Sequence, residues 1–440
     1  MKNLIIIHLE SLSSQFLYDA PKEVLPNLNW VLENSLFFQN YYSTATSTIM
    51  TVGDLMYGDL YQLEKSRNLD DVYKQKTINS MFEQLGKDGY YTAAYVYPCF
   101  SKCNRMDRVN LKKIFGRNTN YEEIAKRNDF QREIANTIKS KKNFAIYVYD
   151  YTSLSSSPFR MKNTERNFLD TVEESYRQMD QTVGFIFQTL RKDSLLNDTA
   201  VMLFGDHGDD LYSHGFCCGF THAIEPYASV IRTPLAIYSN GIQPAKVANL
   251  VNTLDIRKMA LLLLRDCHAE DGIWHTERKY VFSRNIFWNQ RSDMLNKAYS
   301  VTDGKYMLMV SKKGLELYLC KYEAFGVVNL LNFFELCGTK IKLKREMQYV
   351  NGVHVEYMLK KQESSILNEF VALKKELIKN LERLEMNTGI RMSFKPWFRR
   401  IRLNEQIQKE LSATVRQGRA ACKKVNGVKG IKKWITHFVS

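Results

Sequence analysis

The sequence predicts an α/β fold, with a mostly parallel central sheet flanked by helices, a small C-terminal antiparallel sheet and a basic helical tail. Two observations support this prediction. Short runs that are apolar at every position recur between longer helical patterns, as expected for strands covered on both faces. After Gly272 the segments become shorter and alternating, and they are separated by Asp303-Gly304 and Lys313-Gly314, which suit the tight turns between antiparallel strands.

Apolar runs rich in Val, Ile, Phe and Tyr predict five strands of the central sheet, at residues 4–9, 90–97, 144–149, 200–204 and 234–238. Apolar residues three and four positions apart predict helices at residues 76–85, 127–140 and 168–192. The antiparallel sheet is expected within residues 273–335, with strands near residues 279–284, 298–301, 306–310 and 315–319. We therefore expect a catalytic domain over residues 1–335, which includes this small sheet, and a basic helical extension over residues 336–440.

The composition is that of a folded protein with an uneven charge distribution. The chain has 440 residues, of which 45% are hydrophobic and 25% charged, so it can bury a sizeable core. Its net charge is +15; residues 340–440 contain 23 basic and 9 acidic side chains, against 39 and 38 in residues 1–339. Eight cysteines in so long a chain do not indicate a disulfide-rich scaffold, so we expect buried or reduced thiols.

The sequence contains no stretch that suits a membrane-spanning helix, which needs roughly 18 to 20 apolar residues. The apolar run after Lys2 is interrupted by His8 and Glu10, and no small-residue cleavage site follows, so it does not resemble a signal peptide. We therefore expect a cytoplasmic protein, with peripheral binding to the inner face of the membrane as an option.

Acidic and imidazole side chains follow two of the predicted strands. The first strand runs into Glu10, and the fourth runs into Asp206 and His207. Because ligands of open α/β sheets bind outside the carboxyl ends of the strands, these side chains are expected in one crevice. Oxygen ligands with one nitrogen suit zinc or manganese better than calcium. Together they predict a divalent metal site, although each carboxylate taken singly is more often a cap.

Residues 43–58 place a cluster of Ser and Thr hydroxyls before apolar residues at helical spacing. The hydroxyls are thus expected at a helix N-terminus, where free N–H groups and the helix dipole favour an anion. A hydroxyl in contact with a metal ion would be acidified into a nucleophile. Taken alone, this segment favours an ordinary helix cap.

The order of these parts resembles the alkaline phosphatase and sulfatase superfamily, most closely its sulfatase-like branch. The resemblance covers about residues 1–335 and includes the strand that leads to Glu10, Asp206-His207-Gly208 and Arg232-Thr-Pro-Leu235. It implies an alkaline phosphatase-like fold and a metal-dependent phosphotransferase or hydrolase.

By this resemblance the nucleophile is Thr48, counted back from Gly58, which matches the glycine that closes the family's nucleophile helix. Sulfatases oxidise a Cys or Ser there to formylglycine within a Cys/Ser-x-Pro/Ala-x-Arg context, which this segment lacks. Threonine cannot yield that aldehyde, so sulfate-ester hydrolysis is disfavoured. Thr48 resembles instead the branch with lipoteichoic acid synthase and lipid A phosphoethanolamine transferase. That branch implies one zinc or manganese ion held by Glu10, Thr48, Asp206 and His207.

His222 falls where phosphoethanolamine transferases carry a histidine that binds the substrate phosphate or a second zinc, so it is a further catalytic candidate. His214 is expected to be a loop residue. One feature departs from the family: no histidine follows the strand at residues 144–149, where the sequence reads Asp150-Tyr151-Thr152. Either one of these three residues replaces the histidine, or the leaving-group chemistry differs.

The tail from Lys340 onward is expected to be helical, with basic residues interleaved with Trp and Phe, as in Lys395-Pro-Trp397-Phe398. This pattern suits the surface of an anionic membrane, where the rings lie at head-group depth. Nucleic acid is a less favoured partner, although a basic patch attracts any polyanion. An equal alternative is a solvated helical face that packs on the catalytic body.

These features predict a phosphotransferase that works by double displacement through a phosphorylated Thr48. It would move a phosphoethanolamine or phosphoglycerol group from a phospholipid or other phosphodiester donor to a cell-envelope glycan or lipid acceptor. With water as the acceptor, the same residues would make a phosphoesterase or, less favourably, a sulfatase-like hydrolase. A third option is a degenerate member that only binds a polyanion through residues 340–440.

Overall fold

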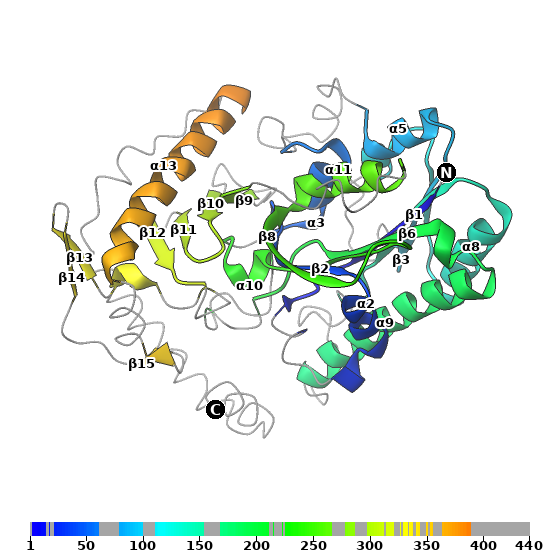
Figure 1. The fold of residues 1–440 in the computed structure, drawn as a ribbon, viewed down its shortest axis with the longest axis horizontal. Helices are drawn as coiled ribbons and strands as arrows, with labels where there is room; N and C mark the ends of the chain where they lie inside the picture. The colour runs from blue at the N-terminus through cyan, green and yellow to red at the C-terminus, as the bar shows by residue number, and fades with distance from the viewer. Residues whose placement is uncertain are drawn as a thin grey trace. The chain divides into compact units, whose positions relative to one another are not determined.

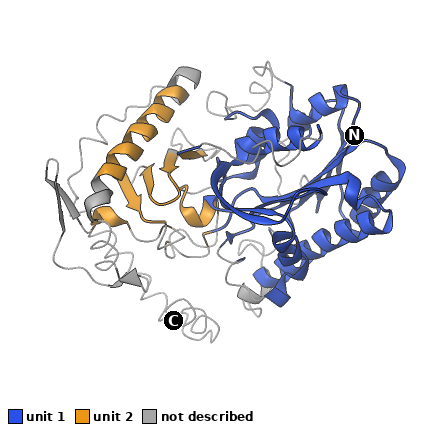
Figure 2. Cartoon of the chain, viewed as in Figure 1, with its two compact units in different colours: residues 1–209, 231–279 blue, residues 210–230, 280–440 orange. Residues whose placement is uncertain are grey.

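The computed structural model divides into two compact units, Met1–Asp209 with Ile231–Lys279, and Asp210–Val230 with Tyr280–Ser440 (Figure 2). The structure describes residues 2–14, 17, 22–60, 79–99, 111–153, 168–210, 214, 222, 225–265, 278–286, 297–311, 314–320, 326, 329–332, 334–337, 340–343, 349–350, 353–354 and 363–388. The separation of a catalytic domain at residues 1–335 from an extension at residues 336–440 stays a prediction.

The first unit is built on an eight-stranded sheet with the order β4-β3-β5-β1-β6-β7-β2-β8 (Figure 1). Its strands are β1 (Asn3–Leu9), β2 (Leu36–Tyr42), β3 (Tyr91–Tyr97), β4 (Asn120–Glu123), β5 (Phe144–Asp150), β6 (Thr199–Gly205), β7 (Leu235–Tyr238) and β8 (Ala245–Asn252). β7 runs antiparallel to both of its neighbours, and the other pairings are parallel. The predicted mostly parallel central sheet is confirmed.

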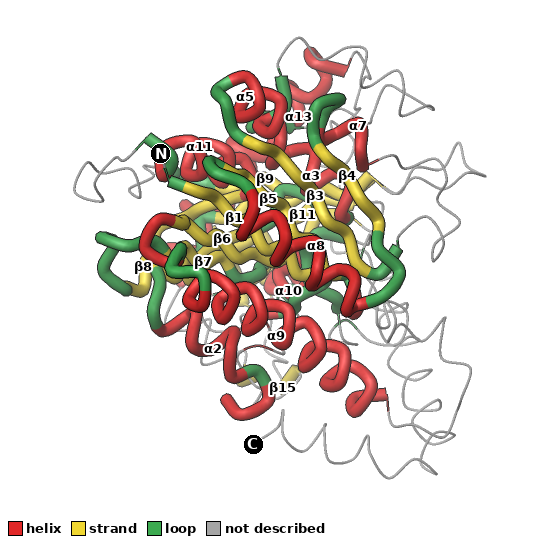
Figure 3. The backbone as a smooth tube through the Cα atoms, turned by 90° about the vertical axis from the view of Figure 1, so that its right-hand side faces the viewer, coloured by secondary structure: helices red, strands yellow, loops and turns green. Residues whose placement is uncertain are grey.

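Helices cover both faces of this sheet (Figure 3). One layer consists of α3 (Thr48–Tyr57), α5 (Met81–Lys87), α7 (Leu111–Phe115) and α11 (Thr253–Leu263). The other layer consists of α2 (Pro26–Glu33), α8 (Arg127–Ser140) and α9 (Phe168–Lys192). The helices predicted at residues 127–140 and 168–192 are therefore present. The predicted helix at residues 76–85 corresponds to α5, which begins after the capping residue Ser80; residues 76–78 lie outside the described residues.

The sequence does not predict β2, β4 or β8, because none of them is a continuous apolar run. β2 has the polar pair Gln39-Asn40 at half-buried positions. β8 is the last strand in the sheet order, and its first half is largely exposed. An edge strand that is open to solvent on one side carries polar residues, so the criterion that finds buried strands misses it.

The second unit contains the predicted small antiparallel sheet, in the order β12-β11-β10-β9. Its strands are β9 (Val281–Ile286), β10 (Lys297–Thr302), β11 (Met307–Ser311) and β12 (Gly314–Tyr318). The long helix α13 (Glu363–Thr388) packs on β10 and β11 and buries Phe370, Leu373, Leu377 and Leu381, which recur at helical spacing. This part of the predicted helical extension therefore packs on the small sheet. Such packing is what the alternative of a solvated helical face on the catalytic body predicts.

The expectation of helix from Lys340 onward is wrong for the residues that the structure describes before α13. Lys340–Leu343 is β14, which pairs with β13 (Phe334–Cys337), and a short hairpin of β15 (Tyr349–Val350) and β16 (Val353–His354) follows. The run Lys340-Ile-Lys-Leu alternates polar and apolar residues, a period of two that indicates a strand. The aromatic and basic clusters after residue 388 lie outside the described residues.

Two further expectations concern the thiols and the membrane. Cys99 and Cys320 are buried and form no disulfide, whereas the vicinal pair Cys217-Cys218 lies outside the described residues. Among the described residues, no helix combines the length and the apolar character that crossing a bilayer requires.

Candidate metal centre

Strand alternation brings the predicted site residues to one face of the sheet. The apolar residues Leu4 and Ile6 of β1 pack in the core beneath α3, and the same alternation continues to His8 and then to Glu10, just beyond the strand. On β6, Phe204 lies in the same core, so Asp206, two residues further on, extends the same face. β1 and β6 are adjacent and parallel, with His8 opposite Phe204. Both carboxylates therefore leave the sheet at the same edge.

Thr48 is the first residue of α3, the helix that covers this face of the sheet, and its side chain points toward these residues. Its Oγ1 lies 3.0 Å from Glu10 Oε2 and 3.3 Å from His207 Nε2. Thr48 is 8% exposed, whereas the side chains of Glu10 and His207 are fully buried. Thr51, one turn later, donates a hydrogen bond to the Asp206 carbonyl at 3.3 Å, which ties α3 to the loop after β6. The hydroxyl cluster is thus at a helix N-terminus, as predicted.

Two contacts of His207 complete the group. His207 Nε2 lies 3.2 Å from Asp206 Oδ2 and 3.6 Å from Glu10 Oε1. Asp206 and His207 are both fully buried. The structure therefore brings Glu10, Thr48, Asp206 and His207 together, although they come from three separate parts of the chain.

The backbone at Ser11 adopts a left-handed conformation, with φ of 52°. This conformation costs a residue with a side chain about 1–2 kcal/mol, and such strain clusters at functional sites. Here it directs the Ser11 N–H at Asp206 Oδ1, with a distance of 3.1 Å. The turn after β1 therefore orients a carboxylate that comes 195 positions later.

Three aromatic or imidazole side chains at the site were not predicted. His8 Nε2 lies 3.3 Å from Asp206 Oδ2. Tyr149 donates a hydrogen bond of 2.5 Å to Glu10 Oε2, and the Tyr147 hydroxyl lies 2.9 Å from His8 Nδ1. The only available signal was the spacing: the pairs 8/10 and 147/149 are two residues apart and so share a strand face, but the sequence does not reveal which strands are adjacent.

Burial and charge affect the ionisation of these groups in opposite ways. Burial by itself raises the pKa of Asp206, but the nearby His207 and His8 imidazoles and the hydrogen bond from Ser11 outweigh it and hold this pKa below its ordinary value. Burial, together with the charge of Glu10, raises the pKa of Tyr149 well above its usual range. Asp206 is therefore an acceptor and Tyr149 a donor at neutral pH.

The residues present fit a bound cation. Two buried atoms that face each other, Asp206 Oδ2 and His8 Nε2, have no hydrogen-bond partner among the described residues. Three residues, His8, Glu10 and Asp206, offer ligand atoms that all lie within 4.8 Å of one another. Ligands bound to one ion at about 2.1 Å lie roughly 3 to 4 Å apart, which matches the separations found here. A divalent ion would satisfy both atoms and balance the two carboxylates.

Two of the three residues that could replace the missing histidine, Asp150 and Thr152, form contacts on the other face of the sheet, whereas replacement by Tyr151 stays a prediction. Asp150 accepts hydrogen bonds from Thr152 N and Oγ1 and from Thr182 Oγ1, at 3.0, 2.5 and 2.6 Å. Its Oδ2 also lies 3.6 Å from Arg127. Asp150 and Thr152 are therefore engaged with α8 and α9.

Both remaining histidine candidates belong to the second unit. His214 contacts Asp210 at 2.5 Å and stacks on Tyr227 at 3.5 Å, which is a structural role within that unit. His222 is half-buried, and its catalytic role stays a prediction.

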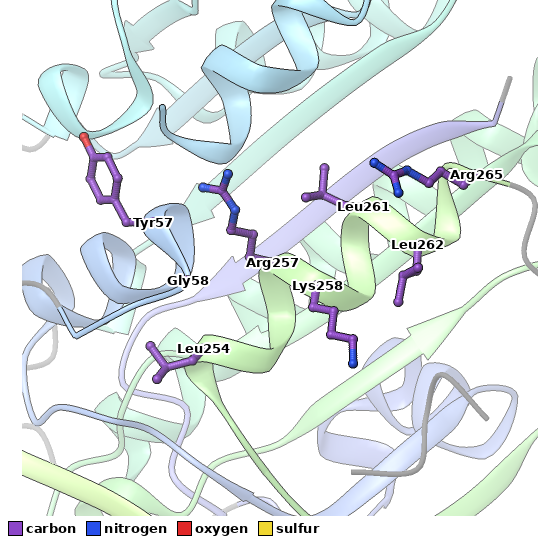
Figure 4. A pocket seen from close by; sticks show the side chains of 8 residues that line it. All are labelled: Tyr57, Gly58, Leu254, Arg257, Lys258, Leu261, Leu262 and Arg265. Carbon is purple, nitrogen blue, oxygen red and sulfur yellow. The ribbon is translucent and has the colours of Figure 1, made fainter. Parts of the chain in front are cut away.

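A pocket of about 310 Å³ lies at the opposite end of α3 (Figure 4). α3 has ten residues, so its two ends are about 15 Å apart. The pocket is lined by Tyr57 and Gly58 of this end and by basic side chains of the α11 region, Arg257, Lys258 and Arg265. Gly58 caps α3 with φ of 66°, and a Cβ there would come 2.9 Å from Arg257 Cδ, so a glycine is required. This pocket is separate from Thr48.

The fold and the site together define an alkaline phosphatase-like α/β enzyme with an acid, hydroxyl and imidazole centre. The chain belongs to the sulfatase family, whose sequence profile matches residues 2–264. The predicted membership of the alkaline phosphatase and sulfatase superfamily, and the prediction of an enzyme of this class, are therefore confirmed. Members of this superfamily are metal-dependent.

One curated relative and two solved structures illustrate what the chain is similar to. Lipoteichoic acid synthase 2 of Bacillus subtilis is 25% identical over 357 residues, which is 72% of this chain and 52% of the relative. A putative sulfatase from Bacteroides thetaiotaomicron has a TM-score of 0.61 and 16% identity, over 89% and 94% of the two chains. The lipoteichoic acid synthase LtaP from Listeria monocytogenes has a TM-score of 0.53 and 16% identity, over 72% and 85%. The chain thus spans about half the length of its curated relative.

Proposed function

We propose that this protein is a metal-dependent phosphotransferase that moves a substituted phosphoryl group through a phosphorylated Thr48. The observation that carries the proposal is the position of Thr48 Oγ1, at the start of α3 and 3.0 Å from Glu10 Oε2. A hydroxyl at a helix N-terminus beside a buried carboxylate and an imidazole has both a route for its proton and dipoles that stabilise a phosphoryl anion.

In the first step Thr48 Oγ1 attacks the donor phosphorus. The new bond is P–Oγ1, and the bond to the donor alcohol breaks in line with it. The hydroxyl proton leaves toward Glu10 Oε2, which lies 3.0 Å from Oγ1. The departing alkoxide takes up a proton. When bound, a divalent ion would lower the pKa of the threonine hydroxyl and neutralise charge on the phosphoryl oxygens.

In the second step an acceptor hydroxyl attacks the phosphothreonine. The P–Oγ1 bond breaks, the acceptor loses its proton, and Thr48 regains one. The backbone N–H groups at the start of α3 face the phosphoryl group in both steps, so they stabilise the same charge twice. We propose that His222 contributes to this neutralisation.

A phosphoryl rather than a sulfuryl group is favoured because Thr48 carries a methyl group on Cβ and cannot yield formylglycine. The lipoteichoic acid synthase relatives support a group of the phosphoglycerol type, with a phosphoethanolamine group as the near alternative. We propose a phospholipid or other phosphodiester as the donor and a cell-envelope glycan or lipid as the acceptor, with zinc or manganese as the metal. Hydrolysis is the second candidate function, since water can replace the acceptor in the same geometry.

The test is to incubate the full chain, loaded with manganese or zinc, with a phosphodiester donor labelled on its head group. Mass spectrometry of the digested protein should find the intact head group on Thr48. Thr48→Val should lose the adduct and about 10⁴-fold of the turnover, since removal of a nucleophile costs at least this much in other enzymes.

Two comparisons make this test specific. Thr189→Val is the matched control, because the Thr189 hydroxyl bonds only the Phe185 carbonyl of its own helix among the recorded contacts, and it should retain both adduct and turnover. Thr48→Ser should keep part of the activity. Slow release of the label to water, with fast release to an added glycerol or glycan, favours transfer over hydrolysis. An adduct on another residue would disprove the proposal.

We propose that the segment at residues 389–440 binds an anionic membrane surface from the cytoplasmic side. It contains 13 of the 23 basic residues counted after residue 339 but only 2 of the 9 acidic ones. Full-length protein with Arg399, Arg400 and Arg402 changed to Gln should sediment less with anionic liposomes. The control changes three exposed basic residues of α13, Lys375, Lys379 and Arg383, and should sediment normally. Equal loss in both variants would contradict the membrane proposal.

A further inference from the structure

We propose that His8 is a ligand of the metal ion, through Nε2, in addition to the four residues assigned above. This inference rests on the metal centre of the proposed function. His8 lies on β1, two residues before Glu10, and both side chains point toward α3. It thereby adds a second imidazole to the ligand set.

The contacts of His8 Nε2 fit those of a metal ligand. The side chain is fully buried, and Nε2 has no hydrogen-bond partner among the described residues. The carboxylate oxygen Asp206 Oδ2 lies 3.3 Å from His8 Nε2. It likewise has no hydrogen-bond partner in the described part of the chain. Buried polar atoms are almost always satisfied, because leaving one without a partner is unfavourable. One ion between them would satisfy both.

The rest of the imidazole is held as metal-bound histidines usually are. Nδ1 lies 2.9 Å from the Tyr147 hydroxyl, on the next strand. A histidine that coordinates through Nε2 carries its proton on Nδ1, so Nδ1–H donates to Tyr147 Oη. The ring stacks on Tyr149 at 4.1 Å with an interplanar angle of 9° and on Phe204 at 4.9 Å. The ring orientation is therefore fixed before any ion binds.

Tyr147 and Tyr149 form a second pair that matches His8 and Glu10. The β1–β5 register places His8 opposite Tyr149, and each tyrosine hydroxyl contacts one of the two β1 side chains. Tyr147 is thus a positioning residue for the imidazole, and Tyr149 is one for the carboxylate. With two imidazoles, the site is better suited to zinc than to magnesium or calcium, which prefer oxygen ligands.

The competing interpretation is an ion pair, in which a protonated His8 donates from Nε2 to Asp206 and never touches the metal. The two interpretations differ in the number of imidazole nitrogens bound to the ion. Electron spin-echo envelope modulation of bound Mn²⁺ counts these nitrogens without any substrate or turnover. The experiment uses the full chain in a His222→Gln background, so that a nitrogen from this predicted site residue is not counted.

The expected count is two imidazole nitrogens in this background, one after His8→Gln and one after His207→Gln. The dissociation constant for Mn²⁺, from equilibrium dialysis, should rise at least about 10- to 100-fold in His8→Gln. Tyr147→Phe should keep two nitrogens but bind Mn²⁺ about tenfold more weakly. Tyr95→Phe is the matched control, since Tyr95 is buried in β3 and bonds Thr137 instead, and it should bind Mn²⁺ normally.

A single nitrogen in the starting background would overturn the inference, whether or not His8→Gln folds. An unchanged count after His8→Gln would also overturn it. Both results would leave the phosphotransferase proposal intact, because they concern only which side chains hold the ion. If the unaltered chain binds neither Mn²⁺ nor Zn²⁺, the metal centre of the proposed function itself fails.

Discussion

Two buried aspartates at the same edge of the central sheet have opposite surroundings. Asp150 ends β5 and Asp206 follows β6, and these strands flank β1 on its two sides. Both carboxyl groups are fully buried. Asp150 accepts three hydrogen bonds from Thr152 and Thr182 and lies beside Arg127. Asp206 accepts one from Ser11 and has an oxygen without a hydrogen-bond partner in the described residues.

The difference arises from the alternation of side chains along a strand. Tyr147 and Tyr149 face α3, so Asp150 points to the other face, where α8 supplies the Arg127 guanidinium and α9 the Thr182 hydroxyl. Asp206 is in phase with Phe204 and faces α3, where the neighbours are carboxylate, imidazole and hydroxyl groups. The hydrogen bonds of Asp150 are satisfied within the protein, whereas Asp206 keeps an oxygen that could bind a ligand.

Removing Asp150 should have the largest effect on stability. Asp150→Ala leaves the Arg127 charge and two hydroxyls without their acceptor, so the free energy of unfolding should fall by about 3–5 kcal/mol. Urea unfolding of the metal-free protein measures this change. The affinity for Mn²⁺ in the folded protein should stay within about twofold. A large loss of metal affinity with normal stability would reverse the assignment of the two aspartates.

Asp206→Asn should show the opposite behaviour. The affinity for Mn²⁺ should fall by more than the roughly 10- to 100-fold that loss of an outer partner costs. Metal-free stability should change by only about 1 kcal/mol, since one neutral hydrogen-bond acceptor for Ser11 remains. Calorimetric titration with Mn²⁺ and thermal unfolding with chelator measure the two effects. Unchanged metal affinity would exclude Asp206 from the ligand set.

Tyr149→Phe should weaken Mn²⁺ binding by about tenfold through the loss of its 2.5 Å hydrogen bond to Glu10. Tyr95→Phe again serves as the control, because it removes a buried tyrosine hydroxyl remote from Glu10. The measurement is the dissociation constant for Mn²⁺ with both variants folded. Equal constants for wild type and Tyr149→Phe would show that Glu10 is oriented without this bond.

The smallest effect concerns pH. Burial raises the pKa of Asp150, and its partners Arg127, Thr152 and Thr182 offset this only in part. The folded protein therefore binds this proton up to a higher pH than the unfolded chain, so its contribution to stability is present near pH 4 and is lost as pH rises through the folded pKa. The slope is at most about 1.4 kcal/mol per pH unit. The free energy of unfolding of Asp150→Asn, measured with urea and chelator across this pH range, should not show this dependence on pH. A pH profile identical to that of the wild type would contradict the prediction.

The sequence was sufficient for much of the fold and for the first four site residues. Buried strands are largely apolar, so β1, β3, β5, β6 and β7 are visible as runs. β2, which Gln39-Asn40 interrupts, the polar β4 and the partly exposed β8 are not. Glu10 and Asp206 are predicted because both follow such runs, and Thr48 is predicted from the family resemblance, by counting back from Gly58. The helix expected from Lys340 fails, since β14 shows a period of two there.

What the sequence by itself determined is the order of the parts: which segments are strands, which polar residues follow them and where the hydroxyl-rich helix α3 begins. Only the tertiary structure decided which of these residues meet. His8 reads in the sequence as an interruption of an apolar run, and its contacts depend on β5 and β6 lying on either side of β1. The physical reason is that local sequence sets the face on which a side chain lies, whereas strand order and register set its neighbours.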